Sequence, residues 1–394
     1  MGEPRRVMIS CVEPSGDMHG AALVKACAEL YPQIKFFGLG GEEMARAGVE
    51  IRANISQVAV MGFSEILGSL RRILKVRSMM AETLIKERPA ALVLIDGPDF
   101  NFYLAKAAKK VGVKVIYYIC PQLWAWRPGR LKLLRELTHR RAVILPFEKP
   151  FYDKRGLSVD EVGHPLFDEL NQKIDSQKVL FSLGLSLDSQ ILAILPGSRK
   201  KVLERLIGPM LQAAALVLKK RPQLIAVLPK AATIETSFLE QFLARAPKEI
   251  TSVLKVVEGR SQEILAVSRL ALLASGTSSV EGAILGLPMI VCYKVSAFSW
   301  FLASRLVKLP FVTIANLIAG REVVPEFLQN RLCAPQLAES LLNLWDDGPL
   351  REKTLSDLAL VRAALGGPGA SRKVARIVAE ETANFEERYD EPSS

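Results

Sequence analysis

The sequence predicts an α/β protein made of two domains, each built on a parallel β-sheet. The chain has 394 residues, enough for two or three domains at about 150 residues each. Short β-branched runs alternate with amphipathic segments along most of it. The strand-like runs are apolar without strict alternation, which is typical of strands buried on both faces of a sheet.

The first half contains five strand-like runs separated by helical segments, at residues 6–11, 34–38, 91–95, 113–119 and 142–145. The series pauses in a polar stretch around 162–189, which predicts a hinge. Five further runs follow, at residues 191–195, 224–228, 252–257, 270–274 and 289–293. Two such series predict two Rossmann-like domains that face each other across a cleft.

The expected domains cover residues 1–170 and 171–348, followed by C-terminal helices and an acidic tail over 349–394. Ligands of open α/β sheets bind beyond the carboxyl ends of the strands. We therefore expect the functional residues on the loops that follow the strands.

Charge, cysteine content and apolar runs indicate which kinds of partner and which cellular compartment to expect. Lys plus Arg number 52 against 41 Asp plus Glu, a net charge of +11 that attracts phosphates, nucleic acid or anionic lipid. The five cysteines form no C-x-x-C pair, which favours free thiols in a reducing cytoplasm over structural zinc. The first apolar run is too short for a signal peptide, and the stretch at 295–312 contains Arg305 and Lys308. We expect a cytoplasmic protein whose membrane contact is peripheral.

The loop after the first strand-like run carries the first candidate site. The run continues into C-V-E-P-S-G-D, which places Glu13, Ser15, Gly16 and Asp17 on a loop facing the cleft. Ser15 or Asp17 could equally cap a helix beginning near Met18. Capping does not explain Glu13.

The loop after the third run reads D-G-P-D-F-N. Asp96 follows five mostly apolar residues at the carboxyl end of a central strand, which favours a functional role over an Asx turn. Asp99 and Asn101 are interpreted as caps of the next helix.

Two loops of the second domain are suited to phosphate. After the run at 191–195, Gly197 and Ser198 can expose backbone amides at a helix start, and Arg199 adds a forked cation. This combination is suited to a diphosphate.

The second of these loops reads S-G-T-S-S-V-E and begins at Ser275. Gly276 and Thr277 would contact phosphate, while Glu281 would bind ribose hydroxyls. Alternatively, Ser278 and Glu281 form a capping box. The residues alone favour neither the ligand-binding interpretation nor the capping box.

Several familiar motifs are missing. There is no G-x-x-x-x-G-K-[ST], and G-L-G-G at 38–41 has Glu43 where the third dinucleotide-fingerprint glycine belongs. Only three histidines occur, without H-E-x-x-H. We expect His164 to pack in the hinge, and we expect neither a cofactor nor a metal.

An apolar stripe at helical spacing follows Gly62, with basic residues around it. Its members are Phe63, Ile66, Leu67, Leu70, Ile73 and Leu74. A core-facing helix gives the same stripe. The basic face, together with the apolar region at 298–302, favours contact with an anionic membrane surface. Nucleic acid is not an expected partner, because the cations are not gathered on one face with stacking aromatics.

The ordered motifs resemble those of the lipid-A-disaccharide synthase family (GT19), which has the GT-B architecture. In the first half these are E-P-S-G-D at 13–17, V-M-G-F-S-E-I-L-G at 60–68, D-G-P-D-F-N at 96–101, P-Q-L-W-A-W at 121–126 and L-P-F-E-K-P-F-Y at 145–152. In the second half they are G-H-P at 163–165, L-P-G-S-R at 195–199, A-S-G-T at 274–277 and N-L-I-A-G-R-E at 316–322.

The resemblance implies an inverting glycosyltransferase of lipid A biosynthesis. It would join UDP-2,3-diacylglucosamine to 2,3-diacylglucosamine 1-phosphate, giving a β-1,6 disaccharide and UDP. UDP would bind the second domain near Arg199, and the acyl sugars the first. The acceptor hydroxyl needs a base, for which Asp96 is the candidate. Glu13 would be a second carboxylate or sugar anchor, and Asn316 would orient donor or acceptor.

Three points stay open. The first is whether Asp96 or Glu13 is the base. The second is the function, because another GT-B UDP-sugar transferase or a UDP-sugar epimerase is an alternative. The family commonly has Ala-Gly where Cys11 and Val12 stand, which leaves the local substrate pose undefined. The resemblance also implies peripheral attachment to the inner membrane of a Gram-negative bacterium. It further implies C-terminal helices that are either swapped in a homodimer or return to the first domain.

Overall fold

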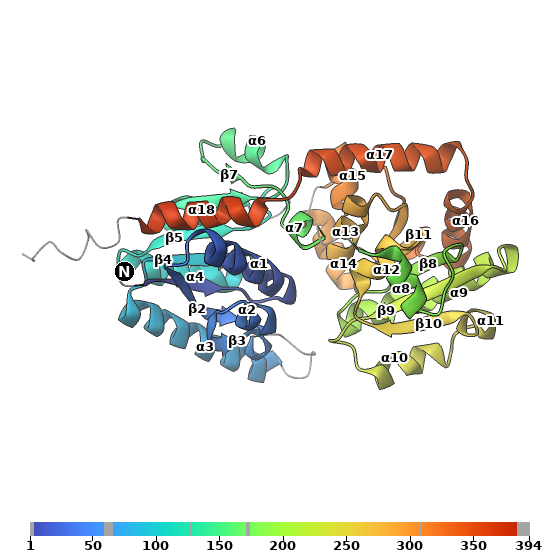
Figure 1. The fold of residues 1–394 in the computed structure, drawn as a ribbon, viewed down its shortest axis with the longest axis horizontal. Helices are drawn as coiled ribbons and strands as arrows, with labels where there is room; N and C mark the ends of the chain where they lie inside the picture. Colours follow the sequence, from blue (N-terminus) through green and yellow to red (C-terminus); the bar gives the residue numbers. More distant parts are fainter. Residues whose placement is uncertain (1–3, 59–65, 126–127, 171–173, 307–308, 384–394) are drawn as a thin grey trace, which may run out of the picture. The chain divides into compact units, whose positions relative to one another are not determined.

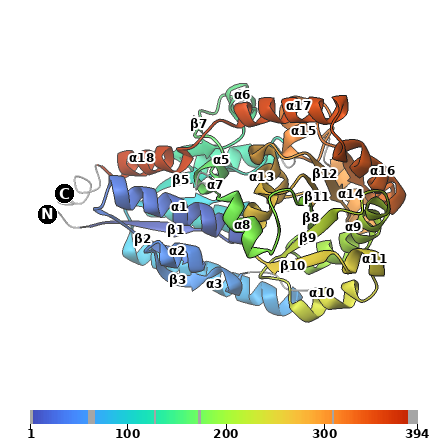
Figure 2. The same ribbon diagram turned by 45° about the vertical axis from the view of Figure 1, so that its right-hand side comes forward.

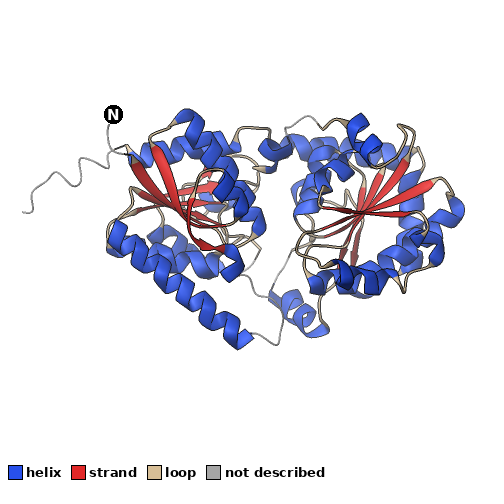
Figure 3. Cartoon of the chain, turned by 60° about the horizontal axis from the view of Figure 1, so that its bottom comes forward, coloured by secondary structure: helices blue, strands red, loops and turns tan. Residues whose placement is uncertain are grey.

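The computed structural model describes residues 4–58, 66–125, 128–170, 174–306 and 309–383. The chain divides into two compact units, Met1–Asn171 with Gly367–Ser394, and Gln172–Gly366. Within each unit, helices cover both faces of a sheet (Figure 3). The predicted α/β fold with two parallel sheets is confirmed.

The sheet of the first unit consists of β1 (Arg5–Ser10), β2 (Ile34–Gly40), β3 (Glu50–Asn54), β4 (Ala91–Ile95), β5 (Lys114–Tyr118), β6 (Arg140–Val143) and β7 (Asp160–Glu161). Its seven strands run in the order β3-β2-β1-β4-β5-β6-β7, and all pairs are parallel. The helices of this unit are α1 (Pro14–Leu30), α2 (Glu42–Arg46), α3 (Ile66–Glu87), α4 (Pro98–Lys110), α5 (Leu131–Leu137), α6 (Glu148–Asp153), α7 (Leu166–Leu170) and α18 (Ala370–Thr382).

Strand β4 shows why these runs lack polar alternation. All five of its residues are buried. Leu92 and Leu94 join the core that contains residues of α3 and α4, whereas Val93 and Ile95 join the core that contains residues of α1 and α18. A strand that is covered on both faces has apolar side chains at successive positions.

The second unit repeats this plan with β8 (Gln190–Leu195), β9 (Leu224–Lys230), β10 (Leu254–Glu258), β11 (Leu270–Ala274), β12 (Met289–Tyr293) and β13 (Glu326–Leu328). The strand order is β10-β9-β8-β11-β12-β13, again parallel. Its helices are α8 (Ser176–Ser182), α9 (Lys200–Lys220), α10 (Thr236–Leu243), α11 (Lys248–Thr251), α12 (Ser261–Ala266), α13 (Thr277–Leu285), α14 (Ala297–Leu306), α15 (Ile314–Ala319), α16 (Ala334–Trp345) and α17 (Pro349–Leu365). Helices α9 and α16 pack side by side (Figure 2).

Both sheets have the strand order in which the direction of winding reverses next to the first strand. The reversal lies between β1 and β4 in the first unit and between β8 and β11 in the second. The loops after two such strands diverge to opposite faces of the sheet and leave room for a ligand between them. These two edges are therefore where binding residues are expected.

The C-terminal helices are divided between the units. Helix α17 packs against α13, α15 and α16, whereas α18 lies along α1 in the first unit (Figure 1). The carboxylate of Asp168 accepts hydrogen bonds from the amides of Gly369 and Ser371, which caps the start of α18. The sequence-based division, which grouped residues 349–394 together, differs here because α18 has its apolar partners in the first unit.

The described part of the chain contains no helix that is both long and apolar enough to cross a bilayer.

Candidate active site

Two carboxylates lie at the winding reversal of the first sheet. Glu13 follows β1 as the N-cap of α1, and Asp96 follows the neighbouring strand β4. Both residues are exposed. The protein atoms around Asp96 nevertheless reduce its hydration, which raises its pKa, and the negative charge of Glu13 adds to this while the amide of Gly97 opposes it. A carboxylate with a raised pKa is a better proton acceptor.

The backbone at Asp96 is held in an unusual conformation. Asp96 and Gly97 have φ of 46° and 52°, in the left-handed region. The carbonyl of Asp96 accepts hydrogen bonds from Asn101 Nδ2 at 2.7 Å and Tyr117 Oη at 2.8 Å. Asn101 is itself fully buried, and its Oδ1 accepts from Ser10 Oγ at 2.8 Å. This network fixes the main chain and leaves the carboxylate of Asp96 accessible.

The capping role expected for Asn101 was wrong, because its side chain donates to the carbonyls of Ile95 and Asp96 and so braces the turn. The N-cap of α4 is Gly97, which has no side chain to bond the helix start. Asp99 pairs with Arg130, and its capping role stays a prediction. The local sequence pattern did not indicate these partners, because Arg130 is distant in sequence and Asn101 bonds to backbone carbonyls.

Gly97 is required at its position for two reasons, which gives a testable prediction. A Cβ atom there would lie 2.4 Å from Val12 Cγ2, in addition to the left-handed strain. We expect Gly97→Ala to lower the free energy of unfolding by roughly 1–3 kcal/mol more than Gly112→Ala, since Gly112 has φ of +72° but open space around it. Adding Val12→Ala should recover most of that difference. Chemical denaturation of the three variants measures it, and equal losses in Gly97→Ala and Gly112→Ala would contradict it.

Asp17 has a structural role. Helix α1 begins at Pro14 rather than near Met18, so Ser15, Gly16 and Asp17 lie in its first turn and not on a loop. The buried carboxylate of Asp17 accepts from the amides of Gly41, Glu43 and Met44, at 2.6, 2.9 and 3.2 Å. The alternative in which Asp17 caps its own helix is wrong, because its carboxylate caps the start of α2.

A hydrogen-bonded pair of a histidine and a glutamate lies near these carboxylates. The sequence did not indicate that these two residues pair. His19 of α1 and Glu169 of α7 are joined by a 2.6 Å hydrogen bond between Nδ1 and Oε1. The charge of His19 opposes the rise in the pKa of Asp96. His164 is buried as expected; desolvation lowers its pKa to about 3, with a further contribution from His19, so it is neutral at physiological pH.

Two loops lie at the winding reversal of the second sheet. Residues Gly197, Ser198 and Arg199 follow β8, and Ser275, Gly276 and Thr277 follow the neighbouring strand β11. Arg199 is the N-cap of α9 and Gly276 the N-cap of α13, and neither N-cap residue bonds to its helix start through a side chain of its own. The first amides of two helices thus lie at one edge of the sheet beside a guanidinium group, an arrangement that suits a diphosphate.

The conformation of Gly197 supports this arrangement. Its φ of +106° is one that glycine adopts readily, and a Cβ there would lie 2.9 Å from Val202 Cγ1. The carbonyl of Ser198 accepts from Thr233 Oγ1 at 2.6 Å. The loop is therefore shaped by its backbone and leaves Ser198 and Arg199 exposed.

The capping-box interpretation of Ser278 and Glu281 was wrong. Because Gly276 is the N-cap, Ser278 lies inside the first turn of α13. Glu281 is buried, and its Oε1 accepts from Gln262 Nε2 at 3.0 Å. Glu281 is thus held by α12, which leaves the ribose-binding interpretation standing as a prediction.

Asn316 differs most from its expected position. Its side chain is fully buried, and its Oδ1 accepts from the amides of Val323 and Val324. Its Nδ2 donates to the carbonyl of Val324 and to Glu326 Oε1. Two acceptor and two donor positions are all a side-chain amide has. In this conformation the side chain of Asn316 has no hydrogen-bonding position left for a donor sugar or an acceptor sugar. It holds the backbone of Val323 and Val324 and the side chain of Glu326 instead.

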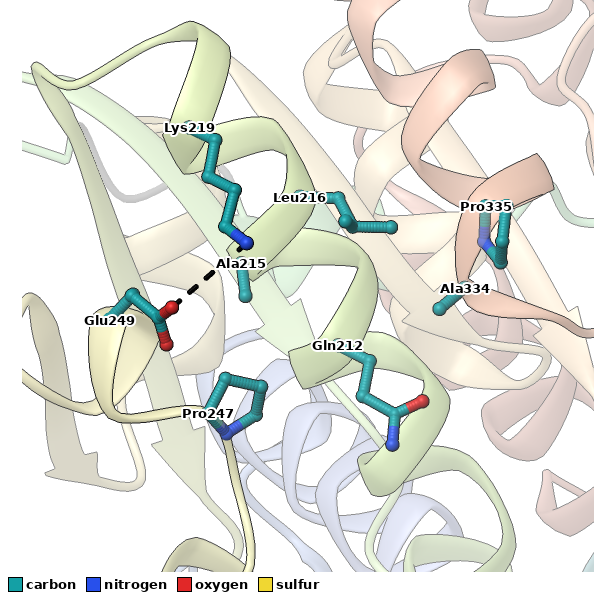
Figure 4. Close-up of a pocket in the computed structure, with 8 residues that line it drawn as sticks. All are labelled: Gln212, Ala215, Leu216, Lys219, Pro247, Glu249, Ala334 and Pro335. Carbon is teal, nitrogen blue, oxygen red and sulfur yellow. Dashed lines mark ion pairs between the residues drawn. The ribbon is translucent and has the colours of Figure 1, made fainter.

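A pocket elsewhere in the second unit contains none of these residues. It is lined by Gln212, Ala215, Leu216, Lys219, Pro247, Glu249, Ala334 and Pro335 (Figure 4). Its α9 residues belong to the second half of that helix, which leads from the carboxyl end of β8 back toward the amino ends of the strands. This pocket is therefore not the candidate site.

The described residues contain no group of three His, Cys, Asp or Glu side chains that could hold a metal ion. The candidate groups are the carboxylates of Glu13 and Asp96 in the first unit, and the backbone amides with Arg199 in the second.

Comparison with solved structures shows the fold. A UDP-GlcNAc 2-epimerase from Neisseria meningitidis bound to UDP-GlcNAc superposes with a TM-score of 0.65 at 12% identity, covering 95% of this chain and 99% of that one. The glycotransferase of kitacinnamycin superposes with a TM-score of 0.63 at 13% identity, covering 97% and 100%. Both support the GT-B architecture of two Rossmann-like units.

Comparison with known sequences shows the family. Lipid-A-disaccharide synthase from Geobacter sulfurreducens is 37% identical over 375 residues, which cover 95% of this chain and 97% of the relative. The Myxococcus xanthus enzyme is 39% identical over 381 residues, with coverages of 96% and 98%. The family model described as lipid-A-disaccharide synthetase matches residues 7–378. The chain belongs to the lipid-A-disaccharide synthase family.

Proposed function

We propose that the chain transfers the diacylglucosamine unit of UDP-2,3-diacylglucosamine to the 6-hydroxyl of 2,3-diacylglucosamine 1-phosphate. The products are UDP and the β-1,6-linked disaccharide 1-phosphate. One observation carries this proposal beyond the family match. The winding reversal of one sheet holds two carboxylates, and that of the other holds two helix starts with Arg199.

The chemistry assigns these groups different tasks. Asp96 accepts the proton of the acceptor hydroxyl as its oxygen attacks the anomeric carbon of the donor. The bond from that carbon to the diphosphate oxygen breaks, and the configuration inverts. Negative charge then develops on the departing UDP, where the amides at the starts of α9 and α13 and the guanidinium group of Arg199 stabilise it. The step needs no metal ion in this scheme.

The two carboxylates differ in a way that favours Asp96 as the base. Its pKa is raised mainly by desolvation, and the charge of Glu13 raises it further. Its backbone is fixed by Asn101 and Tyr117. We assign Glu13, the N-cap of α1, to binding acceptor or donor hydroxyls and to supporting the pKa of Asp96.

An assay of UDP release tests the proposed function. The protein is incubated with UDP-2,3-diacylglucosamine, with and without 2,3-diacylglucosamine 1-phosphate, and with a deacylated acceptor. UDP release that depends on the acylated acceptor supports the proposal. Conversion of the UDP-sugar without any acceptor would instead support an epimerase, and release with the deacylated acceptor alone would indicate a different transferase.

We also propose that α3 contacts an anionic membrane surface. Leu70 and Leu74 are one helical turn apart and are 50% and 39% exposed, with the exposed Arg71, Arg72 and Lys75 beside them. Ile73 faces inward and packs against the core, so it does not belong to the exposed stripe. Phe63 lies outside the described residues, as do the side chains of Ile66 and Leu67. In the second unit, Phe298 and Phe301 of α14 are likewise exposed, at 73% and 50%.

The membrane proposal predicts a loss of lipid binding when the exposed leucines become polar. Leu70→Ser with Leu74→Ser removes two side chains whose burial stabilises binding by roughly 1.5–3 kcal/mol each. We expect at least a tenfold weaker partition onto vesicles containing anionic lipid, with Leu360→Ser as the control because Leu360 of α17 is 65% exposed. Equal flotation of the double variant and the control would contradict the proposal.

A further inference from the structure

A buried carboxylate outside the candidate site connects three segments of the second unit. Glu326, the first residue of β13, is 7% exposed. Its carboxylate accepts from the amides of Val312 and Thr313, both at 3.0 Å, from Thr313 Oγ1 at 2.7 Å and from Asn316 Nδ2 at 2.8 Å. These partners are all donors and all neutral, which suits the acceptor-only carboxylate. Burying a carboxyl group among neutral partners is expensive unless every oxygen is bonded.

The segment that Glu326 holds is also bonded to the loop after β11. Val312 donates its amide to Glu326 and accepts at its carbonyl from Ser275 Oγ at 3.4 Å. The amide of Ser275 donates to the carbonyl of Cys292 at 2.9 Å, in β12. Strand β12 pairs with β13 directly, Val291 being opposite Glu326. Ser275 is thus connected to Glu326 both through Val312 and through the sheet.

The loop that begins at Ser275 has little local support of its own. Gly276 and Thr277 are exposed, and Gly276 caps α13 without a side-chain hydrogen bond. Inside the turn, Ser279 donates its hydroxyl and its amide to the carbonyl of Gly276, at 2.7 and 3.0 Å. Ser275 directly precedes Gly276, the N-cap of α13, so the contacts that hold Ser275 also act on the start of this helix.

We propose that Glu326 is a positioning residue for the diphosphate of the donor: with Thr313 and Asn316 it holds Val312, and through Val312 and Ser275 it aims the first amides of α13. This rests on the proposed function, which places UDP at that loop. It also gives Asn316 a task, because its amide links Glu326 to the backbone of Val323 and Val324.

The test is Glu326→Gln, which keeps the shape of the side chain but puts an NH2 group against at least one donor. We expect the affinity for UDP, measured by calorimetry, to fall about tenfold or more, while the KM for the acceptor changes less than twofold. The control is Glu339→Gln, an exposed carboxylate on α16 of the same unit, which should bind UDP as the unchanged protein does. A folded Glu326→Gln protein that binds UDP within twofold of the control overturns the proposal.

UDP binding by a second variant and hydrogen exchange at the start of α13 test the positioning role further. If Glu326→Gln does not fold, Thr313→Val removes one donor to Glu326 with little change in volume and should weaken UDP binding in the same direction. Without UDP, hydrogen exchange at the amides of residues 277–281 should be faster in either variant than in the control. Unchanged exchange there overturns the positioning role. Failure of the unchanged protein to bind UDP would instead refute the proposed function, so the two failures are distinguishable.

Discussion

Asp96→Asn is expected to reduce kcat by roughly 10²- to 10⁴-fold, the usual contribution of a general base. Asparagine keeps the size and polarity of the side chain but cannot take the proton of the acceptor hydroxyl. The backbone of Asp96 is bonded through its carbonyl to Asn101 and Tyr117, so the substitution should leave the turn intact. UDP affinity should be nearly unchanged, because the loops proposed to bind the diphosphate, at 197–199 and 275–277, belong to the second unit. Steady-state kinetics together with calorimetry of UDP binding measure both quantities.

The control for this variant is Asp99→Asn, three residues further along the same segment. Asp99 pairs with Arg130 at the surface, so we expect kcat to change less than threefold. The pH dependence adds a second readout. Because the pKa of Asp96 is raised, the rate of the unchanged enzyme should fall on the acidic side at a higher pH than an ordinary aspartate would give. An Asp96→Asn enzyme with the rate of the control would remove Asp96 from the mechanism and leave Glu13 as the candidate base.

Arg199→Ala is expected to weaken UDP binding by about 100-fold, because loss of one partner from a hydrogen-bonded charge pair costs about 2–5 kcal/mol. Arg199 is the N-cap of α9 and follows the glycine turn at Gly197, so it belongs to the same helix start as the first amides of α9. The developing charge on UDP should also lose stabilisation, and kcat should fall with affinity. Calorimetry with UDP and single-turnover rates separate the two effects.

Arg245→Ala provides the matched control, since it removes one positive charge from an exposed position of the same unit. If the affinity depends on net charge alone, both variants should weaken binding equally, and raising the salt concentration should abolish the difference from the unchanged protein. Equal and small losses would therefore contradict the assignment of Arg199 to the diphosphate.

Ten strands could be predicted from the sequence, since the predicted runs overlap β1, β2, β4, β5, β6 and β8 to β12. Strands such as β4 and β11 are buried at every residue, so their side chains are apolar in succession. The edge strand β10 was also predicted although it is only partly buried, but three other edge or short strands were not. Strand β3 reads E-I-R-A-N, β7 has two residues and β13 three. Such short or half-polar edges resemble loops, so the strand order and the positions of the winding reversals came only from the structure.

The candidate site shows the same division. Glu13 and Asp96 could be placed because a polar residue directly after a buried strand lies at the carboxyl edge of the sheet. Partners from distant segments could not be predicted. Asp17 caps α2 through amides more than twenty residues away, Glu169 reaches His19 across 150 positions, and Asn316 is saturated by residues 323–326. For Asp17 and Asn101, local patterns suggested caps because capping residues and distant hydrogen-bond partners are the same residue types.

A crystal structure with UDP tests the central claim most directly. We predict that the diphosphate lies within hydrogen-bond distance of Arg199 and of the first amides of α9 and α13, with the ribose near Glu281. Density for the diphosphate at any other place, such as the pocket between α9, α11 and α16, would contradict the account.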